Sequence, residues 1–78
     1  MITKPYPSID VCATGLRLKA LRKEHNIKLD DLALYLKFTS TRAILKWHAG
    51  SCLPSLDSFY ALSILYDMTI NEMIVEVH

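Results

Sequence analysis

The segment from Leu29 to Trp47 constrains the fold of this chain more than any other stretch. It contains two short blocks of apolar residues at helical spacing, namely Leu32, Ala33 and Leu36, followed by Ala43, Ile44 and Trp47. Residues Lys37 to Ser40 lie between the blocks, and Phe38 is the only large apolar side chain among them. This pattern predicts two short helices joined by a tight turn. Because helices of about two turns bury too little surface to be stable alone, the flanking segments must complete the core.

Helix start signals on both sides of this pair predict an all-α domain of five helices. The first helix is expected to run from Thr14, a residue type that suits an N-cap, to His25. A fourth helix is expected to open at the N-cap Ser55 and to bury Leu56, Phe59, Leu62 and Leu65. Thr69 and Glu72 have the spacing of a capping box and predict a last helix that continues to the C-terminus.

Residues 1–13 are expected to form an extended N-terminal arm in front of one domain that spans residues 14–78. Pro5 and Pro7 favour this arm because each lacks a backbone N–H and disfavours helix in the residue before it. The arm contains no arginine, the residue that arms use to read a DNA minor groove. Packing on the domain, or disorder, therefore suits the arm better.

Charge is distributed unevenly along the chain. All nine Lys and Arg fall in residues 1–46 with only four acidic residues, which gives this segment a net charge of +5, whereas residues 47–78 carry −4. A basic front and an acidic back suit the docking of one face on phosphates. The alternative is that these charges lie on solvated faces, because halves of a sequence need not be halves of the molecule.

A set of residues in order resembles the pattern of the lambda-repressor-like helix-turn-helix regulators, also called the Cro/CI or XRE type. The set comprises Leu32-Ala33, Leu36, Phe38, Ile44, Lys46-Trp47, Gly50 and Leu53-Pro54-Ser55. The resemblance covers Gly15 to Ile74 and implies a compact five-helix domain whose third helix enters the DNA major groove, often as a dimer. Two positions depart from the pattern, since Leu29 replaces a glutamine that contacts phosphate in many relatives, and Lys37 replaces the usual turn glycine.

The resemblance also implies which residues meet DNA. The third helix is expected to start at Ser40 or Thr41 and to end by Ala49, with Gly50 as its stop. The base-reading candidates lie near the start or on the outward side of this helix: Ser40, Thr41, Arg42 and Lys46. The phosphate-contacting candidates surround it: Arg22, Lys28, Lys37, Thr39 and Ser51. On the alternative interpretation, Arg42 and Lys46 are merely solvated.

Four side chains in or near this motif admit more than one interpretation. Leu45 either touches thymine methyl groups, packs under the turn, or marks a surface for a protein partner. Arg22 is either free for phosphate or paired with Asp31. His48 is interpreted as a half-buried structural residue rather than a pH sensor. Trp47 is interpreted as a core residue rather than a ligand-stacking one.

Several classes of function are not expected. Cys12 and Cys52 lack a CxxC spacing and, with His25 and His48, form no recognised metal motif, so we predict no metal and no cofactor. No serine has a positioned base and no glycine-rich phosphate loop is present, so an enzyme is not expected. No apolar run approaches the roughly 20 residues of a membrane span and no signal peptide is recognised, which favours a cytoplasmic protein.

The sequence therefore predicts a sequence-specific DNA-binding transcriptional regulator, repressor-like, that acts on double-stranded DNA. Because 51% of the residues are apolar, part of the surface is expected to be a homodimer seam of apolar residues near the C-terminus, with Tyr60, Ile64, Ile74 and Val75 as candidates. These four residues alternatively bind an inducer or another partner. The rival function is a protein-interaction module on the same fold, such as an antitoxin or anti-repressor.

Overall fold

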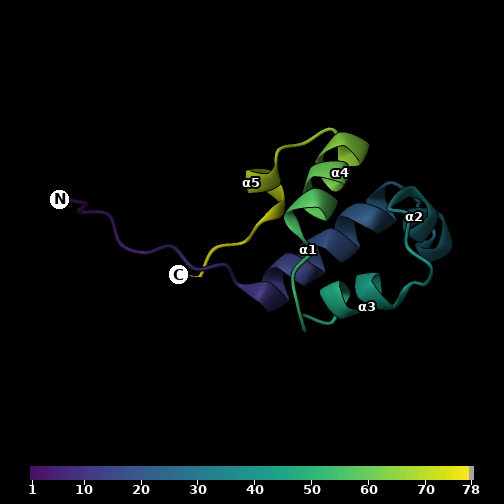
Figure 1. Ribbon diagram of the computed structural model, residues 1–78, viewed down its shortest axis with the longest axis horizontal. Helices are drawn as coiled ribbons and strands as arrows, with labels where there is room; N and C mark the ends of the chain where they lie inside the picture. Colours follow the sequence, from purple (N-terminus) through teal and green to yellow (C-terminus); the bar gives the residue numbers. More distant parts are fainter. Residues whose placement is uncertain (78) are drawn as a thin grey trace.

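The computed structural model describes residues 1–77, which contain five helices and no strand beyond one isolated bridge. The helices are α1 (Val11–Glu24), α2 (Leu29–Tyr35), α3 (Arg42–His48), α4 (Leu56–Tyr66) and α5 (Ile70–Met73). Helix α1 packs against α3 and α5, and α5 also packs against α4 (Figure 1). The predicted all-α architecture is confirmed.

The core draws on all five helices. Its buried apolar side chains are Leu18, Leu21, Leu32, Ala33, Ile44, Trp47, Phe59, Leu62, Tyr66 and Met73. Trp47 is 4% exposed and contacts Phe38 edge to face at a ring-centroid distance of 5.7 Å, which confirms its interpretation as a core residue. The two blocks of apolar residues between Leu29 and Trp47 therefore bury the side of the helix pair that faces the other helices.

The turn between α2 and α3 requires a backbone conformation that is unusual for its sequence. Lys37 has φ +61°, so this lysine lies in the left-handed region that favours glycine. This conformation agrees with its place at the position where the resembling family has a turn glycine. The amide of Phe38 then donates to the Ala33 carbonyl at 2.8 Å and closes the end of α2. Phe38 is half-buried against the core, and this contact offsets the cost of about 1 kcal/mol for a lysine with positive φ.

The start of α1 differs from the prediction. The N-cap is Asp10, whose carboxylate accepts from the Ala13 amide at 3.0 Å, so α1 begins at Val11 rather than near Thr14. Thr14 is fully buried instead, and its hydroxyl accepts from the Val75 amide at 3.0 Å. A threonine that bonds to a distant segment cannot be told from an N-cap by its sequence neighbours alone.

The last helix is also shorter than predicted. The capping box is present, with Thr69 and Glu72 bonded to each other's backbone amides, but α5 ends at Met73. Residues 74–77 continue as an extended segment that pairs antiparallel with residues 8–10, through Asp10 N to Val75 O at 2.8 Å and Val77 N to Ser8 O at 2.9 Å. Three of the four residues in this segment, Ile74, Val75 and Val77, are β-branched, which favours an extended chain over a helix.

The solvent-facing side of α4 is more apolar than predicted. Ser55 is the N-cap as expected, but Leu56 is 75% exposed and Tyr66 takes a place in the core. Phe59, Leu62 and Tyr66 form the side of α4 that enters the core, and α4 packs against α5, which leaves Leu56 on the outer side. Residues 1–8 extend away from the helices beside the C-terminal segment and give the molecule its 46 Å long axis (Figure 1).

Candidate nucleic-acid interface

Helix α3 is fixed at the surface by an unusually close approach to α1. Gly15 in α1 faces the backbone of Trp47, where an added Cβ would overlap the carbonyl oxygen and lie 3.2 Å from the carbonyl carbon. Gly50, with φ +78°, ends α3 and lies against Cys12, so an added Cβ would be 2.9 Å from the Cys12 Cα atom. The two glycines set the distance between α1 and the C-terminal end of α3.

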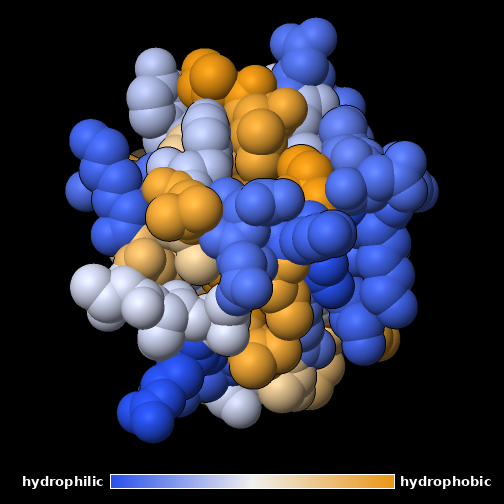
Figure 2. Space-filling model, turned by 90° about the vertical axis from the view of Figure 1, so that its right-hand side faces the viewer, coloured by the Kyte–Doolittle hydropathy of each residue, from blue (hydrophilic) through white to orange (hydrophobic). Residues whose placement is uncertain are grey.

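One side of α3 is buried and the opposite side is open to solvent. Ile44 and Trp47 point into the core. Arg42, Leu45, Lys46 and Ala49 are exposed, and their spacing places them on one continuous helical face. Because Leu45 is 48% exposed in the middle of this face, it does not pack under the turn. Figure 2 views the side of the molecule that carries α2 and α3, where exposed apolar side chains lie among hydrophilic ones.

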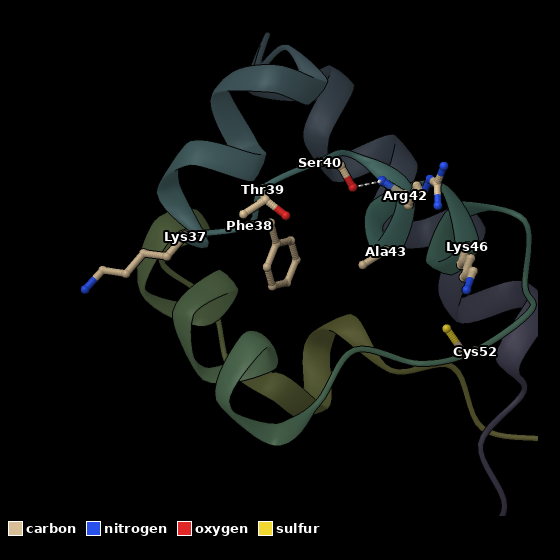
Figure 3. A pocket seen from close by; sticks show the side chains of 8 residues that line it. All are labelled: Lys37, Phe38, Thr39, Ser40, Arg42, Ala43, Lys46 and Cys52. Carbon is tan, nitrogen blue, oxygen red and sulfur yellow. Dashed lines mark hydrogen bonds between the residues drawn. The ribbon is translucent and has the colours of Figure 1, made fainter.

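The turn and α3 together line a depression of about 540 Å³ (Figure 3). Its lining includes five of the predicted DNA-contacting residues: Lys37, Thr39, Ser40, Arg42 and Lys46. Phe38 and Ala43 provide apolar lining, and Cys52 lies at the far end. Figure 3 shows Lys37 on the opposite side of this depression from Arg42 and Lys46. The structure thus brings base-reading and phosphate-contacting candidates to one surface.

The start of α3 has one long polar contact. The backbone amide of Arg42 donates to the Ser40 hydroxyl at 3.4 Å, whereas Thr41, the N-cap, makes no side-chain capping bond and is half-buried. Ser40 and Thr41 therefore precede α3 instead of beginning it. The helix starts at Arg42, one or two residues later than predicted from the sequence. The hydroxyl hydrogen of Ser40 remains available as a donor.

The other phosphate-contacting candidates lie at separate places around α3. Lys28 is the N-cap of α2 and is exposed, and Ser51 is exposed directly after Gly50. Arg22 is half-buried, and its Nη1 donates to the Ile27 carbonyl at 2.8 Å. This bond, rather than one to Asp31, holds the Arg22 side chain.

A second depression, of about 440 Å³, lies on the other side of α3. Its lining residues come from α1, α2 and α3: Lys19, Arg22, Lys23, Leu29, Leu45, His48 and Ala49. No role was predicted for Lys19 or Lys23 from the sequence. The sequence does contain a signal for a cationic face, because Lys19, Arg22 and Lys23 share one side of the helix. That this face lies next to His48 depends on how α1 crosses α3.

His48 lines this second depression, where its burial and the nearby positive charges both affect its pKa. Burial, followed by the positive charges of Arg22, Lys19 and Lys23, lowers the pKa of His48 to about 4. His48 is therefore neutral near pH 7 and is half-buried as predicted.

Acidification is expected to destabilise the fold through His48. The unfolded chain binds a proton at His48 near its ordinary pKa of 6.5, whereas the folded chain binds it only near pH 4. Stability from this residue is thus complete above pH 6.5 and is lost as the pH falls from 6.5 towards 4. Urea unfolding at pH 7 and pH 5 should show a smaller drop in midpoint for His48→Gln than for the unmodified protein. Equal drops in the two proteins would contradict the assignment.

Other features of residues 1–77 add no further site. No group of three or more His, Cys, Asp or Glu side chains is placed to hold a metal ion in this part of the chain. Cys12 and Cys52 are both free and exposed. Among the described helices, none has the length and apolarity needed to cross a membrane.

Neither a protein-family model nor a curated protein matches this chain. Solved structures do resemble it. The restriction-modification controller protein C.AhdI from Aeromonas hydrophila aligns with a TM-score of 0.71 and 22% identity over 82% of this chain and 96% of that one. The DNA-binding domain of BldD aligns with a TM-score of 0.69 and 13% identity over 85% and 94% of the two chains. The S. venezulae BldD DNA-binding domain aligns at 0.68 and 13% over 85% and 97%. These likenesses confirm the predicted fold.

Proposed function

We propose that this protein, whose fold is that of the lambda-repressor-like helix-turn-helix domains, is a sequence-specific transcriptional regulator that binds double-stranded DNA. Helix α3 enters the major groove and presents Arg42 to the base edges, with Ser40 and Thr41 at its entrance and Lys46 one turn further along. The observation that carries the proposal is the exposed face of α3, which holds two cationic side chains on a helix whose opposite side buries Ile44 and Trp47 in the core.

The surroundings of α3 support the same function. Lys28, Lys37, Thr39 and Ser51 are exposed around the helix and can contact phosphates on either side of the groove, together with Arg22. Two of the structurally similar proteins are described as DNA-binding domains and the third as a controller protein. The basic N-terminal half of the chain contributes α1, α2 and most of α3 to this side of the molecule.

Selection of bound sequences from a random duplex pool tests the proposal. We expect enrichment of a defined motif, and an affinity for it that falls as salt concentration rises. A pool that remains random, together with the absence of salt-dependent duplex binding, would refute the function.

We further infer that the protein binds DNA as a homodimer through the outer side of α4. Leu56, Tyr60 and Ile64 recur every four residues and are 75%, 64% and 62% exposed. Asp57 is the only charged residue within α4, so two copies of this face can pack around a two-fold axis with little repulsion. Ile74 and Val75 are half-buried beside the N-terminal segment. We therefore propose a seam on α4 in place of one formed by the C-terminal residues.

Ile64→Lys is expected to convert the dimer to a monomer, because it places a positive charge within the apolar seam. Sedimentation or light scattering measures the change. Leu16→Lys is a matched control, since Leu16 is also an exposed apolar residue (63%) but lies on α1. The dimer seam is wrong if both variants associate like the unmodified protein, or if both become monomeric.

One observation favours a second candidate function, a protein-interaction module. Leu45 is exposed in the middle of the α3 face, and Leu34 on α2 is 74% exposed. Leucine side chains at these places suit a protein partner better than a phosphate backbone. Salt-insensitive binding to a protein, with no binding to duplex DNA, would support this alternative.

A further inference from the structure

We propose that Lys19, Arg22 and Lys23 on α1 form a phosphate-binding site that holds a backbone phosphodiester of the duplex beside α3. This inference rests on the proposed function and deepens it, because it extends the DNA contact from the helix-turn-helix unit to the flank of α1. Arg22, which was predicted on its own as a phosphate contact, is one of three cations in this site.

The three cations converge through the regular geometry of α1. Residues three and four positions apart lie on the same face of a helix, so Lys19, Arg22 and Lys23 are neighbours. This face meets His48 and Ala49 of α3 in the depression of about 440 Å³ described above. No carboxylate lines the depression. The cations therefore face a hollow large enough for a phosphate group and are not neutralised within it.

Arg22 is the fixed part of this cluster. Its Nη1 is held by the Ile27 carbonyl at 2.8 Å, which limits the positions that the guanidinium can adopt. Its Nε is buried and has no hydrogen-bond acceptor. A buried donor without an acceptor is costly, so the donor set of Arg22 is incomplete without a further partner. An anion in the depression would provide acceptor oxygens next to this guanidinium.

The walls of the depression strengthen its attraction for an anion. Leu29, Leu45 and Ala49 provide an apolar lining, in which charges interact more strongly than in open water. Lys19 is half-buried and Lys23 is exposed, and both line the depression. Burial lowers the pKa of His48 most, and the same three cations lower it further, so their positive field reaches the depression that His48 lines. A bound phosphate must act in the opposite direction and raise the pKa of His48.

Salt-dependent DNA binding by Lys19→Gln and Lys23→Gln variants tests the site. Each substitution removes one charge and retains a good helix former, so α1 is expected to stay folded. Each should reduce the slope of log K against log salt by about 0.9. We compare the affinity of the unmodified protein with that of the double variant. The ratio of the two affinities should fall about 12-fold between about 50 and 200 mM salt, on specific and random duplexes alike. Lys4→Gln is the matched control, because Lys4 lies in the arm and should leave the slope unchanged.

The His48 pKa, measured by NMR with duplex and separately with inorganic phosphate at constant ionic strength, identifies the phosphate source. We expect it to rise with duplex in the unmodified protein and to rise less in the Lys19→Gln/Lys23→Gln variant. A rise of equal size with inorganic phosphate alone would assign the site to free phosphate and overturn the phosphodiester. Tight duplex binding with unchanged slopes and an unchanged His48 pKa would overturn the site itself. If no duplex binds, the proposed function fails, and the inorganic phosphate titration alone then decides whether the cluster binds phosphate.

Discussion

Gly15→Ala is expected to lower the free energy of unfolding by about 3 kcal/mol, the upper part of the range for overpacking a closely packed interior. The added methyl group would overlap the carbonyl oxygen of Trp47 and come within 3.4 Å of the Gly50 amide nitrogen. Both neighbours belong to the backbone, so no side chain can rotate away to make room. Either α1 moves away from α3 or the core between them opens.

The sign of this effect separates the close approach from ordinary helix propensity. At an exposed helical position, replacement of glycine by alanine stabilises a helix by about 1 kcal/mol. Ala20→Gly on the same helix is the reverse control: Ala20 is exposed, and the change should cost about 1 kcal/mol. Urea unfolding of both variants provides the comparison. A stabilised Gly15→Ala protein would show that α1 and α3 are not in backbone contact.

A second consequence follows for binding. Because α1 holds the C-terminal end of α3, a Gly15→Ala protein that still folds has to tilt or shift α3. If α3 reads DNA as proposed, we expect this variant to lose affinity for the selected duplex even at temperatures where it remains folded. The stability and binding measurements together show whether this glycine fixes the fold, the orientation of α3, or both.

The local signals in the sequence were sufficient to predict most of the fold. The helical spacing of Ala33, Ile44 and Trp47 depends only on which side of each helix must be buried, so it predicted the core side of the helix-turn-helix unit. The Thr69–Glu72 capping box and the positive φ of Lys37 involve residues within a few positions of each other. Interactions of this range can be recognised in a sequence without a tertiary structure.

The errors arose where a distant segment decides the local structure. Thr14 was predicted as an N-cap, but it is buried because its hydroxyl bonds to Val75, 61 residues away. The same pairing of the two ends stops α5 at Met73, although the residues that follow retain an apolar spacing compatible with a helix. The assignment of Leu56 to the core was wrong. Which side of α4 is buried depends on how the helix packs against α5 and the rest of the core, and helical spacing alone does not determine it.

The candidate site shows the same division. That Arg42 and Lys46 lie on the outer side of α3 follows from helical spacing once Ile44 and Trp47 are buried. In contrast, the approach of Lys19 and Lys23 to His48 depends on the crossing of α1 and α3, which has no signature in either helix alone. The exposed face of α3 could therefore be predicted from the sequence, whereas the part played by the flank of α1 could not.

Arg42 and Lys46 are expected to contribute to DNA binding in different ways, although both are cations on the same face of α3. Arg42 is the first residue of the helix, where α3 would approach the base edges, and its guanidinium can bond to a guanine through two parallel donors. Lys46 lies one turn further along and carries a single ammonium group. Lysine at this place is suited to a phosphate, which has the same charge at every base pair.

Arg42→Ala is therefore expected to cost about 1–3 kcal/mol of discrimination at one base pair of the preferred site, while binding to random duplexes falls much less. Lys46→Ala should weaken binding to preferred and random duplexes by a similar factor and reduce the salt slope by about 0.9. Titration of each variant against the selected duplex, its single-base-pair variants and a random duplex measures the difference. If Arg42→Ala weakens all duplexes equally, Arg42 contacts the backbone instead of a base. If neither variant changes duplex binding, the exposed face of α3 does not bind DNA, and its leucine Leu45 is better explained by a protein partner.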